Sequence, residues 1–249
     1  MNTEGKTRLE QLQAALVGPA STVYAAQKYA GDEVCTKTKA AYRRMVDAHI
    51  LVSGVVGGML LRTEGKRTEH GDSVQERRVL FASYVVGMPL CEKAIEEGRY
   101  LQALTLLRHE MEILAQIASS HLGKRVCGKA AKLSVLRKDI SRMHGTLSAA
   151  AHSAKHAMAS ELLTREYETE DRISTGTHFY PVLNETLARR AFAFHLILTI
   201  DLICQMAIDY QVTHPTDGVG PLDQEAVNVA LGVLEEEGMV EICEKRDIA

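Results

Sequence analysis

Hydrophobic residues recur every three or four positions over most of the chain, which is the spacing of one face of an α-helix. The clearest stripe lies within residues 99–122, where apolar side chains alternate in steps of four and three: Tyr100, Leu104, Leu107, Met111, Leu114 and Ala118. Two other stretches, 50–61 and 196–208, are apolar on all sides, as in helices buried in a core. The first is too short to span a bilayer and the second contains Asp201, so we expect neither to cross a membrane.

Two prolines interrupt sequences that otherwise favour helix. Pro19 is expected to separate a short helix over residues 7–17 from another over residues 19–30, because proline lacks a backbone N–H. Pro89 is expected to kink or divide the helix that follows Ser73. The N-terminal third of the chain is therefore predicted to be a series of interrupted helices.

The second half predicts helices over residues 133–163 and 185–211, the latter capped by the side chain of Asn184. Between them, residues 165–181 alternate Thr, Tyr and Glu, which indicates either a short β-hairpin or an extended surface loop. A final helix ends near Gly238.

These patterns together predict an all-α fold, an irregular bundle of about six to eight helices. Residues 1–214 are expected to form the bundle, and residues 215–249 a linker with an acidic C-terminal helix. The composition is that of a soluble globular chain, with 46% hydrophobic and 24% charged residues. Because only 5% of residues are aromatic and none is Trp, we expect a core of aliphatic and Met side chains.

The five cysteines are widely spaced and form no C-x-x-C pair, which is typical of reduced thiols in a cytoplasmic protein. The first residues contain no apolar signal segment. We expect no cofactor and no membrane contact. Because the two apolar stretches exceed what one small bundle needs to bury, we expect a homo-oligomer, most simply a homodimer.

The net charge of −3 hides an asymmetry along the chain. Residues 121–165 contain nine basic and two acidic side chains, whereas residues 217–249 contain nine acidic and two basic ones. Such a basic segment favours RNA or another anionic partner. The candidate nucleic-acid-binding residues are Lys124, Arg125, Lys129, Lys132, Lys138 and Arg142. The alternative is a solvated face, partly neutralised by the acidic segment of the same chain or of a neighbour.

His152 and His156 lie one helical turn apart, the spacing of a metal-binding pair. No third ligand is evident from the sequence, so we expect no metal site there. Arg108 and Glu112 have the same spacing and would orient His152 from a facing helix, giving a candidate acid–base or anion-binding cluster. The alternative is a structural ion pair between helices. Glu110 is expected to face water.

An Arg followed by a His five to seven residues later resembles the R-x4–6-H signature of HEPN-type helical ribonucleases. In that family, the Arg and His of paired subunits act on the scissile phosphate. The best match is Arg137…His144, where Lys138 supplies the polar second residue and the surrounding segment is basic. Arg190…His195 lacks that polar residue and is expected to belong to the core.

A second resemblance covers about residues 95–160. The motifs LLRxxxE and LSxxxH are similar to two helices of uncharacterised all-helical bacterial proteins, and they would give importance to four side chains: Arg108, Glu112, Ser148 and His152. Those proteins have no settled activity. This chain departs from their pattern in having His144 where a Tyr is expected.

The leading hypothesis is a nucleic-acid-directed protein, a HEPN-like endoribonuclease or defence-type effector in which Arg137 and His144 act on phosphate. The alternative is a non-enzymatic helical module for binding or oligomerisation. A third hypothesis is a bundle that binds a metal or small molecule through Arg108, Glu112 and His152.

Overall fold

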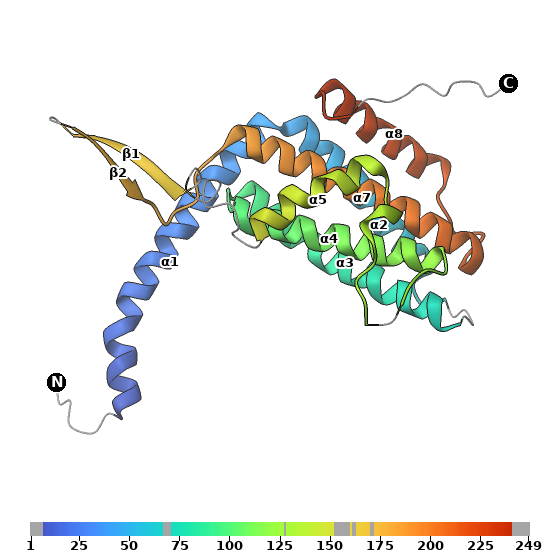
Figure 1. Ribbon diagram of the computed structural model, residues 1–249, viewed down its shortest axis with the longest axis horizontal. Coiled ribbons are helices and arrows are strands. Elements are labelled where there is room, and N and C mark those ends of the chain that lie inside the picture. The colour runs from blue at the N-terminus through green and yellow to red at the C-terminus, as the bar shows by residue number, and fades with distance from the viewer. Residues whose placement is uncertain are drawn as a thin grey trace.

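The computed structural model describes residues 7–66, 71–126, 128–151, 160, 163–169 and 172–240. In this part the chain forms α-helices with one β-hairpin, which confirms the predicted all-α class (Figure 1). The elements are α1 (Arg8–Ala41), α2 (Arg43–Thr63), α3 (Asp72–Glu96), α4 (Tyr100–His121), the short 3-10 helix η1 (Leu133–Val135), α5 (Lys138–Ala151), β1 (Thr164–Thr169), β2 (Arg172–Thr177), α7 (Glu185–Thr213) and α8 (Pro221–Glu236).

The core lies among α2, α3, α4 and α7, with α5 packed on α4 and α8 on α2. All six apolar positions of the stripe predicted in α4 are buried, so this helix is confirmed residue by residue. Helix α7 is buried along most of its length, and its N-cap is Asn184, whose side chain accepts the backbone N–H of Leu187 at 3.0 Å as predicted. Aliphatic and Met side chains fill most of this core, with Phe192 and Tyr84 as its largest members.

The predicted helix break at Pro19 is wrong, because α1 runs without interruption from Arg8 to Ala41. Helix α3 likewise continues through Pro89. Both prolines are exposed, so the carbonyl that loses its backbone partner at each position is available to water and the helix is not forced to end. The first half of α1 instead projects from the bundle as one arm (Figure 1).

A second projection is the hairpin, in which β1 pairs antiparallel with β2 in a register that joins Thr164 to Thr177. The hairpin was one of the two predicted alternatives for this segment and is confirmed. The helix predicted over residues 133–163 begins later, at Lys138, and residues 152–159 lie outside the described part of the chain.

Two helices, α2 and α7, are long and apolar enough to cross a membrane when judged by length and composition alone. In α7, 72% of the most apolar window is buried inside the bundle, against 39% in α2. Buried core helices of soluble proteins satisfy the same criterion.

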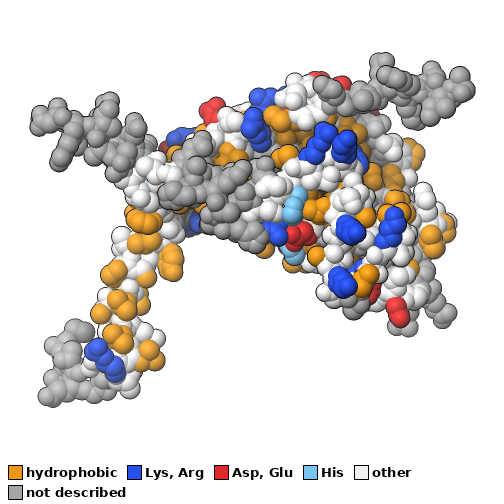
Figure 2. Space-filling model, viewed as in Figure 1, with side chains coloured by type: hydrophobic (Ala, Val, Ile, Leu, Met, Phe, Trp, Pro, Cys, Tyr) orange, Lys and Arg blue, Asp and Glu red, His pale blue; other side chains and the backbone are white. Residues whose placement is uncertain are grey.

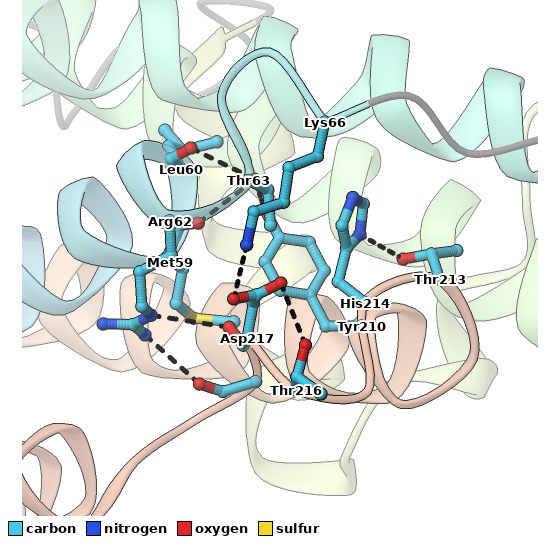
Figure 3. Close-up of polar contacts among 11 residues, drawn as sticks. Met59, Leu60, Arg62, Thr63, Lys66, Tyr210, Thr213, His214, Thr216 and Asp217 are labelled. Atoms are coloured by element: carbon cyan, nitrogen blue, oxygen red, sulfur yellow. Dashed lines mark hydrogen bonds and ion pairs between the residues drawn. The ribbon is translucent and has the colours of Figure 1, made fainter.

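The described part of the C-terminal acidic segment, residues 215–240, docks on its own chain. Val227, Ala230 and Leu234 of α8 are buried against the bundle. Ahead of α8, Lys66 binds the Asp217 carboxylate at 2.7 Å, and Arg62 donates to the Asp217 carbonyl at the ends of α2 and α7 (Figure 3).

Further ion pairs hold the same segment in place. They join Arg62 to Asp223 at 2.6 Å, Arg189 to Glu237 at 2.8 Å, and Arg44 to Glu236. Within residues 217–240, the acidic side chains that form ion pairs therefore do so with α2, α7 and the residues just after α2, and not with the basic segment.

Candidate nucleic-acid interface

A cavity of about 600 Å³ lies where α4 ends and the chain turns toward α5. Its wall includes Gln116 and Ser119 of α4, together with four of the six predicted nucleic-acid-binding side chains: Lys124, Arg125, Lys129 and Lys132. We call this space the basic cavity. Figure 2 shows Lys and Arg side chains gathered on the face where Figure 1 places the connection from α4 to α5.

The backbone of this connection is held by α4 itself. The Lys124 N–H donates to the Ser119 carbonyl at 2.8 Å, and the Gln116 side-chain amide donates to the Lys129 carbonyl at 3.1 Å. Gly123, in the left-handed region with φ of 63°, allows the chain to reverse at the end of the helix. The basic side chains are therefore attached to a segment that is tied to the bundle rather than to a free loop.

The charges of the basic cavity are only partly compensated. Arg125 pairs with Glu76 of α3 at 2.7 Å. Lys124, Lys129 and Lys132 are exposed, and within the described ranges no carboxylate forms an ion pair with them. The sequence also allowed the acidic segment of the same chain to neutralise this face. Among the described residues, no acidic side chain of that segment forms an ion pair with the three lysines, because the acids that form ion pairs bind α2, α7 and the residues just after α2. The cavity wall thus offers excess positive charge to a ligand.

Arg137 and His144, the predicted catalytic pair, lie at the start and in the middle of α5. Arg137 binds Asp139 through its Nη2 atom at 2.5 Å, and this hydrogen bond holds the pKa of the Asp139 carboxyl below its usual range. His144 Nε2 lies 2.9 Å from the Ser148 hydroxyl. The seven-residue spacing separates the two residues by about 10 Å along the helix, on the same face. Each of the two side chains thus already has a partner no more than four residues away in the sequence.

Three of the four residues of the second resemblance lie on α4 and α5, two helices that pack against each other. Arg108 Nε donates to Glu112 Oε1 at 2.8 Å, with the Arg108 side chain more buried than that of Glu112. Ser148 lies half-buried on α5, which packs on α4. His152 and His156 lie outside the described residues, so the structure does not test their predicted roles.

The prediction that Glu110 faces water is wrong. Its side chain is buried, and its Oε2 atom lies 2.9 Å from Nδ1 of His195 on α7. The signal for this burial was in the sequence, because position 110 follows Leu107 by three and precedes Leu114 by four, which places it on the apolar stripe. His195 is fully buried, as predicted from its apolar surroundings.

The sequence did not predict the buried polar groups that surround Glu110 and His195. Burial alone would lower the pKa of His195, but the charge and hydrogen bond of Glu110 outweigh burial and raise it. His49 of α2 lies beside it, with ring centroids 4.8 Å apart, and its Nδ1 atom is 3.3 Å from Glu92. Cys91 of α3 completes this group. Sequence alone could not join these residues, because they come from four helices.

No family model matches the chain, and no curated protein or solved structure matches it either.

Proposed function

We propose that the protein binds nucleic acid, RNA foremost, through the basic cavity and the start of α5. The observation that carries this proposal is the uncompensated charge of Lys124, Lys129 and Lys132 around the cavity. Lys138 and Arg142 are exposed one turn apart on α5, so the positive surface continues beyond the cavity. An extended basic surface suits a chain of phosphates better than a single phosphorylated small molecule.

The expected mode of binding is recognition of the phosphate backbone. No Phe or Tyr occurs in residues 121–165, so the segment offers no aromatic platform for stacking bases. Affinity should therefore depend weakly on base sequence and steeply on salt. The described free thiols of Cys35, Cys91 and Cys204 accord with the cytoplasmic location that we propose.

Reversing three charges is expected to weaken RNA binding by roughly tenfold or more, because each lysine lost removes a phosphate contact. The variant is Lys124→Glu with Lys129→Glu and Lys132→Glu. The magnitude of the slope of log affinity against log salt should fall by about two, since each contact with a single strand releases about 0.7 counterion. Fluorescence anisotropy of a labelled single-stranded RNA, measured over a series of salt concentrations, gives both quantities.

The matched control reverses three exposed lysines away from the basic cavity: Lys28, Lys37 and Lys93. It changes the net charge by the same amount and should leave the salt slope near that of the wild type. Equal weakening by both triple variants would contradict a defined site and indicate general charge attraction. An RNA affinity of the wild type that is unmeasurable even at low salt would refute the proposal.

Cleavage by Arg137 and His144 stays a prediction, and the same RNA tests it. If the chain is a ribonuclease of the kind it resembles, His144→Ala should abolish cleavage while binding and helical content are retained. If the wild type bound RNA without cleaving it, only the proposed binding function would stand. That outcome would agree with the ion pair to Asp139, which already occupies the Arg137 guanidinium.

A second candidate function, self-association, is favoured by the projecting half of α1. Residues 11–27 contain no charged side chain. Leu9, Leu12, Leu16 and Val23 are exposed at spacings of three, four and seven, which are those of a helix–helix seam. We propose that this seam pairs with α1 of a second copy, giving the homodimer expected from the sequence.

Deleting residues 1–25 is expected to convert the dimer into a monomer that remains folded. The deletion spares Gly31, Val34 and Thr38, the buried residues of α1. Light scattering at micromolar concentrations should give the mass of two chains for the full protein and of one for the truncated protein. A full-length protein that is monomeric throughout would contradict self-association through α1.

A further inference from the structure

Three helices bring a thiol, a carboxylate and an imidazole together inside the bundle. Cys91 comes from α3, Glu110 from α4 and His195 from α7. One potential ligand atom from each, the Cys sulfur, a Glu oxygen and a His ring nitrogen, lies within 4.8 Å of the other two. All three side chains are at most 3% exposed. We call these residues the Cys91–Glu110–His195 cluster.

Hydrogen bonding within the cluster leaves polar atoms unsatisfied. The contact between Glu110 Oε2 and His195 Nδ1 uses one atom of each group. The other carboxylate oxygen, Glu110 Oε1, and the other ring nitrogen, His195 Nε2, are buried and have no hydrogen-bond partner in the described part of the chain. Buried polar atoms without a partner are uncommon and costly, and they call for an explanation such as an ion.

We propose that the Cys91–Glu110–His195 cluster binds a divalent transition-metal ion, Zn²⁺ in the first instance. Sulfur, nitrogen and oxygen are the donors that Zn²⁺ takes in proteins, at distances near 2.0–2.3 Å, and three protein ligands are enough for a site. Ligand atoms on one tetrahedral ion lie about 3.5 Å apart. A contraction of roughly 1 Å from the largest spacing would bring one donor atom of each side chain into that range.

Charge balance supports a divalent ion over a monovalent one. Binding releases the thiol proton of Cys91 to solvent, so the ligands become a thiolate, a carboxylate and a neutral imidazole. Their charge of minus two cancels that of the ion, which matters in a core where an uncompensated charge is expensive.

Neighbouring groups are placed to support the ligands. The His49 ring packs against the His195 ring, and Glu92 lies 3.3 Å from the Nδ1 atom of His49. This packing restricts the orientation of the His195 ring, as the groups around ligating side chains do in known metal sites. This inference is independent of nucleic-acid binding and concerns the interior, not the basic cavity.

Cobalt provides the direct test. Protein stripped with a chelator and then titrated with Co²⁺ alone should bind one ion per chain and develop a thiolate-to-cobalt charge-transfer band. Added Zn²⁺ should displace the cobalt and remove the band. Cys91→Ser should lose the band, whereas the matched controls Cys35→Ser and Cys204→Ser, whose thiols lie outside the cluster, should keep it with the same stoichiometry.

A measurement on the wild type covers the case in which Cys91→Ser fails to fold. X-ray absorption at the zinc edge should show one sulfur ligand together with nitrogen or oxygen ligands. Folded wild-type protein that binds neither Co²⁺ nor Zn²⁺ would overturn the proposal. A band retained by folded Cys91→Ser protein, or a zinc shell without sulfur, would do the same. None of these results depends on whether the protein binds RNA.

Discussion

Asp209→Ala is expected to lower the free energy of unfolding by about 3–5 kcal/mol, because it leaves a buried guanidinium without its counter-ion. Asp209 of α7 binds Arg77 Nε of α3 at 2.7 Å, and both residues are buried. Within the described ranges, the other side-chain hydrogen bond of Arg77 joins it at 3.3 Å to the Ser120 hydroxyl on α4. One uncharged contact at that distance cannot replace the carboxylate.

Chemical denaturation monitored by circular dichroism measures this loss. The control is Glu236→Ala, which removes an ion pair to Arg44 whose two side chains are more than half exposed, and which should cost less than about 1 kcal/mol. Replacing both members of the buried pair, as Arg77→Met with Asp209→Leu, should recover most of the stability, because no buried charge is left behind. A loss below 1 kcal/mol in Asp209→Ala would show that solvent reaches Arg77.

The helical fold could be predicted because it depends on local periodicity. The stripe of α4 and the Asn184 cap of α7 are properties of neighbouring residues, and both occur where the sequence places them. The break predicted at Pro19 failed for a related reason. The free-energy cost of a proline inside a helix depends on whether the carbonyl that loses its N–H partner can reach water. Only the structure shows that this part of α1 is exposed.

The site could be predicted only in part. The density of lysine and arginine identified the basic segment, but Gln116 and Ser119, which shape the cavity and hold the connection, carry no charge and gave no signal. The buried polar groups could not be predicted from the sequence at all. Cys91 and His195 are far apart in the chain, and only the packing of α3 against α7 places them together.

The buried polar groups could not be predicted while Glu110 was expected to face water. The expectation that Glu110 faces water agrees with the general rule that acidic side chains are seldom buried. The spacing of Glu110 from Leu107 and Leu114 was a stronger indicator of burial than its residue type, since helical geometry determines which side chains face the core. A buried charge requires a partner, and His195 is the partner that packing supplies.

Glu110→Ala is therefore expected to destabilise the metal-free protein by about 3–5 kcal/mol, as for other buried pairs from which one member is removed. The His195 ring would lose the carboxylate that lies 2.9 Å from its Nδ1 atom while remaining fully buried. The substitution also opens a space between α4 and α7, which adds to the cost.

Exchanging both side chains for leucine separates the cost of an unpartnered buried group from the cost of the space left between α4 and α7. Glu110→Leu with His195→Leu fills the volume and removes the polar atoms, including the two that have no partner, Glu110 Oε1 and His195 Nε2. The double variant should be within about 1 kcal/mol of the metal-free wild type or more stable, because a buried pair gains little over well-packed apolar side chains. Denaturation in the presence of a chelator gives both values. If the double variant were as unstable as Glu110→Ala, the pair would contribute net stability of its own. If added Zn²⁺ then stabilised the wild type but neither variant, the polar interior would be retained for the ion it binds rather than for the fold.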